Sequence, residues 1–357
     1  MVLIVYYKYF LILAFGWKIK FAKKVKNKKS YLLIDKEKRG KMKYEVITVG
    51  SSLVDALVYA GVKEKNGELR FPIGTKILLD TINFSVGGGG ANSAICFSHL
   101  GLKTGVVGKI GSGYNAQIIL RELKENKVDF LGVQGRGHTG YSIVLGTKDG
   151  NRTILCFKGE NNDLKFSEID LKNLETRWFY FTSMGGESFE SQKKIAIFSG
   201  KNNTKIAYNP GSYHTKHGAN YLKEILRRTY FLSLNKEEAR MLVKTGDLFK
   251  GLRKLGPGIV CVTDGSKEGG IYDGKSLYRY WPNKVKVVDS TGAGDVFSSS
   301  FVTGLHRLNN IKSAIKIAMA NAESLIKVPG AHNGLLNWNE IMRVISKKRF
   351  RVKREEL

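Results

Sequence analysis

Cysteine and proline are scarce in this sequence, and the scarcity excludes several kinds of protein. The three cysteines among 357 residues lie far apart and form no CxxC pair, which excludes a zinc ribbon and a thioredoxin-like redox site. A sparse, odd number of cysteines is typical of a reducing compartment, so we expect a cytoplasmic protein. Five prolines stand against 40 glycines, a balance that favours an α/β protein with many tight loops.

Acidic side chains are also few, with 31 Asp and Glu against 59 Lys and Arg and a net charge of +28. Such a charge could attract nucleic acid. However, the sequence has no RNA-binding aromatic signature, zinc finger or helix-turn-helix pattern. A basic surface would equally attract a nucleoside triphosphate. We expect no specific nucleic-acid partner, and salt-sensitive binding to DNA or RNA would support the alternative.

The N-terminal segment has one apolar run, residues 2–17, which is interrupted by Lys8 and followed by a lysine-rich stretch. A membrane-spanning helix needs about 20 apolar residues, so this run is short. A signal peptide carries its positive charge before the apolar run, whereas here the order is reversed. We expect residues 1–41 to be an extension outside the catalytic domain, either a mis-assigned start before Met42 or a weak anchor, and we expect no membrane partner.

From residue 42 onward, short apolar runs alternate with amphipathic segments of helical period. This alternation is typical of βαβ units, which build a parallel sheet with helices on both faces. The predicted strands are 45–49, 105–108, 178–181, 205–208, 230–234 and 259–263. The predicted helices are 91–100, 116–125, 189–198, 221–227, 236–243 and 248–255.

Two regions contain β-like runs without helices between them. Residues 57–85 include an Asn66-Gly67 turn, and residues 141–157 have the pattern of a hairpin around residues 148–151. We predict that together they form a small β-sheet that covers a ligand as a lid. The main domain is predicted to span residues 42–346, followed by a basic tail over residues 347–357.

The strongest chemical signal is the heptad Asp289-Ser-Thr-Gly-Ala-Gly-Asp295. It follows a strand-like run, residues 285–288, and precedes a segment whose apolar residues recur at helical spacing. Gly292 and Gly294 have no side chains, so backbone N–H groups of this turn can approach an anion closely. The start of a helix adds a partial positive charge. The heptad therefore predicts a phosphate-binding turn.

Asp295 lies at the start of the predicted helix, beside this turn. A carboxylate there could accept the proton of a hydroxyl that attacks phosphorus. The alternative is that Asp295 only caps the helix, but the complete heptad favours the base. A Walker A site is excluded because Gly87–Gly90 is followed by Ala91-Asn92 instead of Lys and Ser or Thr.

These segments resemble the two signatures of the ribokinase-like (PfkB) carbohydrate kinases. The C-terminal signature, DTxGAGD, matches residues 289–295, with Ser290 in the usual threonine position. The N-terminal signature matches the Gly-rich run and Asn92, followed by Leu-Gly at 100–101 and Val-Gly-Lys-Ile-Gly at 107–111. The resemblance covers roughly residues 44–336. It implies a three-layer α/β/α fold with a mostly parallel central sheet and a small β lid.

The resemblance implies roles for particular residues. Those on the substrate side are Asp55, Gly88, Gly89, Asn92 and Asn161. Those on the nucleotide side are Asn235, Glu238, Thr263, Gly265 and Asn321, with Glu238 also holding Mg²⁺ through water. Asp295 would be the general base, and the anion hole would consist of Gly292, Ala293 and Gly294. Asn235 and Glu238 could also form a helix capping box, and the two roles are compatible.

The resemblance also implies that ATP with Mg²⁺ is the phosphate donor and that a sugar or nucleoside is the acceptor. It implies that K⁺ can act near Asp289 and Thr291, and it allows a homodimer through an exposed lid edge. A non-catalytic sensor of sugar or nucleotide is the alternative. Three departures stand out: Glu160 replaces the usual alanine before Asn161, Gly89 replaces a lysine of ribokinases, and Glu268 replaces a glycine.

Overall fold

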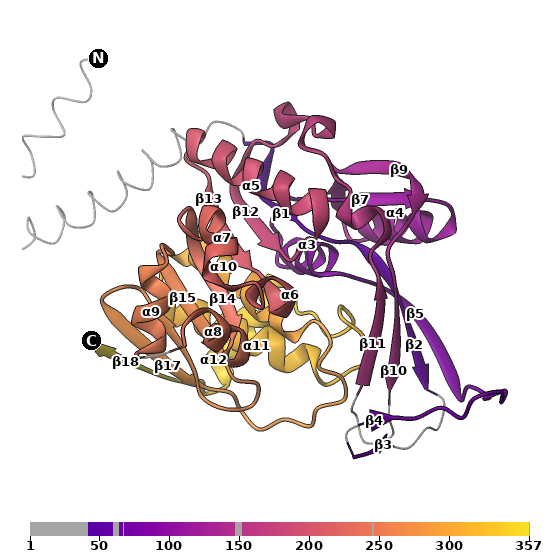
Figure 1. The fold of residues 1–357 in the computed structure, drawn as a ribbon. Helices are drawn as coiled ribbons and strands as arrows, with labels where there is room; N and C mark the ends of the chain where they lie inside the picture. The colour runs from indigo at the N-terminus through magenta and orange to yellow at the C-terminus, as the bar shows by residue number, and fades with distance from the viewer. Residues whose placement is uncertain (1–41, 60–63, 67, 147–151, 245, 357) are drawn as a thin grey trace, which may run out of the picture. The chain divides into compact units, whose positions relative to one another are not determined.

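A ten-stranded sheet forms the centre of the protein, in the order β18-β17-β16-β15-β14-β13-β12-β1-β6-β8 (Figure 1). The computed structural model describes residues 42–59, 64–66, 68–146, 152–244 and 246–356. The strands from β8 to β15 run parallel, whereas β16, β17 and β18 are antiparallel. Their bounds are β1 (Tyr44–Val49), β6 (Thr104–Val107), β8 (Val128–Phe130), β12 (Thr176–Thr182), β13 (Lys205–Asn209), β14 (Thr229–Asn235), β15 (Ile259–Thr263), β16 (Gly269–Tyr272), β17 (Ser276–Trp281) and β18 (Arg351–Glu356).

Helices cover both faces of this sheet, because neighbouring residues of each strand point to opposite sides. On β12, Phe179 and Phe181 belong to one core cluster and Trp178 and Tyr180 to the other. The first cluster is covered by α5 (Gly186–Lys201), α7 (Gly218–Leu226), α8 (Lys236–Leu242) and α9 (Leu248–Lys254). The second is covered by α3 (Gly89–His99), α10 (Ala293–Leu308), α11 (Ile311–Leu325) and α12 (Trp338–Lys347). The predicted three-layer α/β/α fold with a mostly parallel sheet is confirmed.

Every predicted strand of the parallel sheet and every predicted helix is present, with shifts of a few residues at the ends. The predicted helix 116–125 is α4 (Tyr114–Glu125). Three helices, α6 (Gly211–Thr215), α11 and α12, were not predicted. The prediction that residues 285–288 are strand-like was wrong, because these residues form no strand. The sheet position beside β17 is taken by β18. Val287 and Val288 are exposed instead of buried in a sheet.

The prediction of a basic tail after residue 346 was also wrong, because residues 351–356 form β18 at the end of the sheet. Arg279 on β17 donates to Glu355 at 3.0 Å, and the Arg351 guanidinium lies 4.2 Å from the centre of the Trp281 ring. Such cross-strand pairs stabilise a strand that has almost no apolar residues. The basic residues here are therefore part of the main domain.

A second, four-stranded sheet forms the lid, in the order β11-β10-β2-β5, and Figure 1 shows it beside the helical body. Its strands are β2 (Leu53–Tyr59), β5 (Thr81–Gly87), β10 (Tyr141–Gly146) and β11 (Arg152–Phe157). The lid regions are those predicted, except that the first strand begins at Leu53. Asn66 has a left-handed φ of 55° between the short strands β3 (Glu64–Lys65) and β4 (Glu68–Leu69). The predicted hairpin turn at 148–151 and the extension 1–41 lie outside the described residues.

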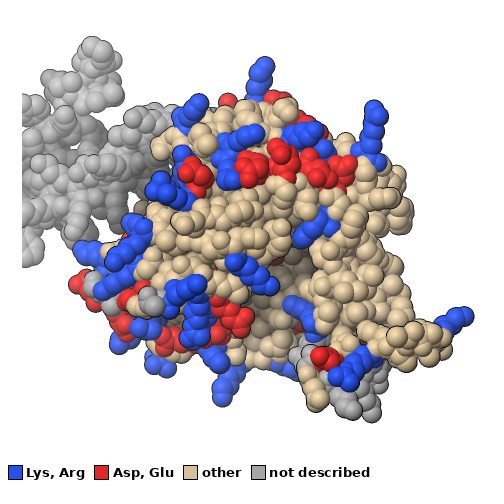
Figure 2. Space-filling model, in the orientation of Figure 1, with Lys and Arg blue, Asp and Glu red and all other residues tan. Residues whose placement is uncertain are grey.

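The surface shown in Figure 2 is hollowed between the lid and the helical body, and Lys and Arg side chains lie around the hollow. Elsewhere on this face, basic side chains alternate with acidic ones and do not gather in one patch. None of the helices within the described residues has both the length and the apolar character that a bilayer crossing requires.

Candidate active site

The turn before α10 has the geometry of an anion-binding site. Gly292 is the N-cap of α10 and has φ 73°, a left-handed conformation that favours glycine. The Ala293 N–H donates to the Ser290 carbonyl at 3.2 Å. Within the described residues, the Gly292 and Gly294 N–H groups have no hydrogen-bond partner. Two of the three predicted anion-hole amides are therefore open, and the third is used by the turn itself.

Asp295, the predicted base, lies in the first turn of α10 and is half-buried. Burial raises the pKa of its carboxyl from 3.8 to about 6; the hydrogen bond from Asn92 lowers it, and the nearby charge of Glu238 raises it. A carboxylate with a pKa near 6 is mostly ionised at neutral pH, yet it is more basic than an ordinary aspartate. This group can therefore accept a proton from a hydroxyl.

A short chain of hydrogen bonds orients Asp295. Asn92 Nδ2 donates to Asp295 Oδ2 at 3.1 Å, and His332 Nε2 donates to Asn92 Oδ1 at 2.9 Å. Burial lowers the pKa of His332 to about 4, and the charge of His99 adds to this, so the imidazole is neutral at physiological pH. Asn92 was predicted to bind the substrate. In this structure its amide positions the base, and His332 was missed because it lies 240 residues further along the chain.

Glu238 lies close to this site, at the start of α8. Its Oε2 accepts from the Asn235 N–H at 2.9 Å, and Asn235 Oδ1 accepts from the Glu238 N–H at 2.8 Å, so the two residues form a capping box. Glu238 Oε1 accepts from the Ser212 hydroxyl at 3.1 Å. The carboxylate is buried, and its two oxygens retain lone pairs beyond these bonds.

A cavity of about 550 Å³ adjoins the anion-binding turn. Thr263 and Gly265, which were predicted to bind the nucleotide, line one part of it together with Ala293 and Gly294 of the predicted anion hole. The rest is largely apolar and includes Val285, Val287, Met319, Ala322 and Ile326. A pocket with apolar walls and open amides at one end can hold a heterocyclic base and its phosphates. The run 285–288, wrongly predicted as a strand, thus contributes to its wall.

Asn321, predicted to contact the nucleotide, is fully buried beside this cavity. Its Nδ2 donates to Ser300 Oγ at 2.9 Å, and its Oδ1 accepts from the Leu336 N–H at 2.9 Å. These bonds join α10 and α11 to the segment before α12. Asn321 therefore supports the pocket from behind, and it does not line the cavity.

The predicted substrate residues Gly88 and Gly89 lie where chains approach very closely. Gly88 has φ 90°, and a side chain there would meet the Ser51 carbonyl oxygen at 2.5 Å. A side chain on Gly89 would meet the Thr182 side chain at 2.9 Å. A lysine, as ribokinases have at the position of Gly89, would not fit without a shift. The glycines allow α3 to begin directly against the end of β1.

Asn161 is also fully buried, and backbone groups engage its side chain. Its Oδ1 accepts from the Ser52 N–H at 2.9 Å, and its Nδ2 donates to the Ser52 carbonyl at 2.9 Å and to the Lys158 carbonyl at 3.2 Å. The amide was predicted to bind substrate. It instead fixes the chain that leads into β2, and so it positions Asp55.

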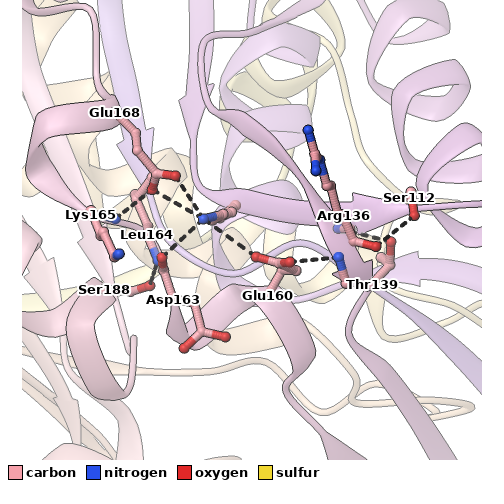
Figure 3. A network of polar contacts seen from close by, with 12 residues as sticks. Ser112, Arg136, Thr139, Glu160, Asp163, Leu164, Lys165, Glu168 and Ser188 are labelled. Atoms are coloured by element: carbon pink, nitrogen blue, oxygen red, sulfur yellow. Dashed lines mark hydrogen bonds and ion pairs between the residues drawn. The ribbon is translucent and has the colours of Figure 1, made fainter.

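The replacement of alanine by Glu160 is matched by a buried lysine, Lys109. Lys109 Nζ lies 3.4 Å from Glu160 Oε2 and 2.9 Å from Glu168 Oε1. Glu160 Oε1 also accepts from the Gly137 N–H at 2.7 Å. Figure 3 shows the network that surrounds Glu160 and Glu168. These contacts tie the segment that carries Asn161 to the neighbouring strands β7 (Lys109–Ser112) and β9 (Val133–His138).

One face of the lid is turned toward the anion-binding turn. Strand pairing places Tyr59 opposite Gly146, which pairs with Arg152 on β11. Since residues two apart along a strand share a face, Asp55 and Arg152 lie on the same side of the lid. Arg152 Nη1 lies 3.2 Å from Asp289 Oδ1. This face therefore looks into the hollow between the lid and the body.

Asp55 on this face is held in a polar setting. Burial raises the pKa of its carboxyl, while the Ser142 hydroxyl and the charges of Lys158 and Arg152 oppose the rise. A side chain on Gly87 would meet Asp55 Oδ2 at 1.9 Å and would displace this carboxylate, so the glycine leaves the Asp55 side chain its place. A carboxylate fixed in this way can accept hydrogen bonds from substrate hydroxyls.

Asp289 and Thr291, predicted to hold a monovalent cation, are joined to each other and to Arg152. Asp289 Oδ1 accepts from the Thr291 N–H at 2.8 Å and from the Thr291 hydroxyl at 2.7 Å, and Asp289 Oδ2 accepts from the Gly330 N–H at 2.9 Å. Burial opposes ionisation of Asp289, but these bonds and the charge of Arg152 together keep its pKa below the usual value.

Comparison with known proteins shows the family to which the chain belongs. The model of the pfkB family carbohydrate kinases matches residues 49–338. A curated relative, an uncharacterized sugar kinase of Archaeoglobus fulgidus, is 29% identical over 247 residues, which cover 67% of this chain and 97% of the relative.

Solved structures share the fold. A ribokinase of Arabidopsis thaliana in complex with ribose and ATP has a TM-score of 0.73 at 23% identity, over 85% of this chain and 99% of its own. A nucleoside kinase of Methanocaldococcus jannaschii has a TM-score of 0.68 at 24% identity, over 86% and 99%. The family match extends over most of the chain and includes both signatures. The protein therefore belongs to the pfkB family of carbohydrate kinases and is a kinase.

Proposed function

We propose that this kinase transfers the γ-phosphoryl group of ATP to a hydroxyl of a sugar, with Asp295 as the general base. One observation carries the proposal: a half-buried carboxylate with a raised pKa lies next to the Gly292 and Gly294 N–H groups, which have no partner among the described residues, at the edge of the 550 Å³ cavity. Charge develops on phosphoryl oxygens during transfer, and amides fixed in advance stabilise it without reorganisation.

The steps follow from this arrangement. Asp295 accepts the proton of the sugar hydroxyl while the oxygen attacks the γ-phosphorus in line with the leaving ADP. Asn92 and His332 keep the carboxylate directed at the acceptor. The lid face with Asp55 covers the acceptor and excludes water, which would otherwise be phosphorylated in its place.

Glu238 fits the role of a Mg²⁺ ligand through water. Its carboxylate is buried near Asp295, and Oε1 meets only the Ser212 hydroxyl. Within the described residues, no three His, Cys, Asp or Glu side chains come together as a metal site. This suits Mg²⁺, which is commonly held by one or two carboxylates, water and substrate phosphates. When bound, the ion would neutralise charge on the phosphates.

The lid favours a sugar over a nucleoside as acceptor. Asn83 and Ser85 share the inner face with Asp55, since β5 pairs with β2 in that register. The aromatic residues Phe84 and Phe157 lie on the opposite face, and Tyr59, which is on the inner face, stands at the end of β2, four residues from Asp55. Hydroxyl and amide groups suit a polyol, whereas a flat base is usually stacked on an aromatic ring. A nucleoside kinase remains the second candidate, because the M. jannaschii nucleoside kinase shares the fold.

The outer face of the lid supports a homodimer. Ile82, Phe84, Leu155 and Phe157 are about half exposed there, and side chains of this type seldom gather on a free surface. A second copy of this chain could cover them through the same face, because a two-fold interface is self-complementary. Light scattering should then show a dimer for the wild type and a monomer for Phe84→Ser. A monomeric wild type would contradict this part of the proposal.

The acceptor can be identified by ADP release from the full chain with ATP and Mg²⁺, in a panel of hexoses, pentoses, sugar acids and nucleosides. We expect one sugar to stand out. If only nucleosides are phosphorylated, the second candidate is correct. If the folded protein binds ATP but releases no ADP with any acceptor of the panel, either the acceptor lies outside these classes or the protein acts as a sensor, and ligand-induced thermal shifts distinguish the two.

A further inference from the structure

A lid arginine reaches the loop that forms the anion-binding turn. Arg152 Nη1 donates to Thr291 Oγ1 at 2.7 Å and to Asp289 Oδ1 at 3.2 Å. Arg152 is the first residue of β11, the lid strand that Figure 1 shows nearest the helical body. Asp289 and Thr291 immediately precede Gly292, so one guanidinium connects the lid to the anion hole.

The contact leaves little room for a monovalent cation at these two residues. Asp289 Oδ1 already accepts from the Thr291 N–H and hydroxyl, and Asp289 Oδ2 accepts from the Gly330 N–H. The Thr291 hydroxyl accepts from Arg152 as well. A cation bound through these side-chain oxygens would have to displace the guanidinium. The side chains that were predicted to hold K⁺ therefore do not fit that role here.

We propose that Arg152 supplies the positive charge beside the anion-binding turn in place of a monovalent cation, and that this charge arrives only when the lid closes. The proposal rests on the anion hole of the proposed function. An arginine is protonated at every physiological pH, so its charge is constant and only its position changes. Opening the lid would carry the charge away with β11. Closure of the lid over the acceptor would bring the charge back to the anion-binding turn. The turn would therefore have its positive charge only when water is excluded.

The burial of the partners distinguishes this pair from an ordinary surface ion pair. An exposed pair contributes little, because water screens both charges. Here the Asp289 side chain is only 14% exposed and that of Arg152 34%. Another salt bridge of the lid region, between Arg70 and Glu68, has side chains 65% and 64% exposed. Arg70 therefore offers a matched control: a lid-region arginine in an ion pair that touches no part of the site.

The test compares the full-length wild type with Arg152→Gln, Arg152→Lys and the control Arg70→Gln. Each is assayed in KCl and in tetramethylammonium chloride at equal ionic strength, about 0.1 M, so that screening is constant. The first readout is phosphoryl transfer to the acceptor that the panel identifies. The second is the thermal unfolding midpoint in the two salts, which requires no substrate.

We expect the wild type and Arg70→Gln to transfer phosphoryl groups at the same rate in both salts. Arg152→Gln should be about tenfold slower in tetramethylammonium chloride, the change that corresponds to one charge-assisted hydrogen bond. K⁺ should recover part of that loss and raise the unfolding midpoint of this variant alone. Arg152→Lys, which retains the charge, should lie closer to the wild type.

Two results would overturn the proposal. One is a wild type that K⁺ activates severalfold, since the turn would then depend on a cation. The other is an Arg152→Gln variant that matches Arg70→Gln in both salts and in both readouts. Neither result tests the role of Asp295 as the general base. Loss of turnover in an Asp295 variant would still support the proposed kinase mechanism. Retention of turnover in that variant would contradict the mechanism but not the role of Arg152.

Discussion

Replacing Asp295 by asparagine should stabilise the protein while it removes catalysis. Asparagine has nearly the same shape, and its side-chain oxygen can still accept from Asn92. It carries no charge, so the cost of burying a carboxylate disappears. The pKa of Asp295 rises from 3.8 to about 6 on folding. At 1.36 kcal/mol per unit, the ionised carboxylate lowers the free energy of unfolding by about 3 kcal/mol at most.

The sign of the pH dependence follows from the raised pKa. Between about pH 4 and pH 6 the folded protein binds more protons at Asp295 than the unfolded chain does, so this group weakens the fold as the pH rises. Asp295→Asn should therefore raise the free energy of unfolding by about 1 to 3 kcal/mol at pH 8, and this increase should shrink toward pH 4.5. Urea unfolding of both proteins at the two pH values measures it. A variant that is less stable than the wild type at pH 8 would refute the reasoning.

Two further predictions concern the turn and the buried histidines. Gly294→Ala should fold normally, because a methyl group there meets nothing within 4 Å. It should nevertheless raise KM for ATP by about tenfold or more, since Gly294 lines the cavity and the methyl group would occupy open space beside it. Normal ATP kinetics in that variant would remove Gly294 from the anion hole. Burial also lowers the pKa of both His214 and His332 from 6.5 to about 4. The folded protein holds both imidazoles neutral, so their contribution to the free energy of unfolding is complete above pH 6.5. This contribution is lost as the pH falls toward 4, by up to about 3 kcal/mol for each histidine. Urea unfolding of the Asp295→Asn protein from pH 7 to pH 4.5 isolates this loss from the opposite effect of Asp295. A flat profile would contradict it.

The parallel half of the sheet could be predicted from the sequence because its strands are continuous apolar runs. Buried strands such as β12 and β14 consist largely of large apolar residues, and helices with one apolar stripe follow them. The antiparallel end of the sheet could not be predicted in the same way. The charged residues of β18 resemble a solvated tail, and its partner β17 lies about 75 residues earlier in the chain.

Within the site, the residues of the heptad were predictable because glycines, an acidic residue and a helix start lie next to one another in the sequence. The functions of Asn92 and Asn161 were harder to predict. Both were expected to bind substrate, but each amide is engaged by groups that come close only in the folded chain. His332 and Arg152 gave no local signal at all. Their partners lie more than a hundred residues away, and a single sequence does not reveal such pairs.

The central claim is that Asp295 accepts the proton during phosphoryl transfer. The most direct measurement is kcat for acceptor-dependent ADP release at pH 8 and saturating ATP and Mg²⁺, for the wild type and for Asp295→Asn. The account predicts that the variant is folded, binds ATP and is at least about 100-fold slower. A folded variant that retains turnover near the wild-type rate would show that another group, or none, accepts the proton.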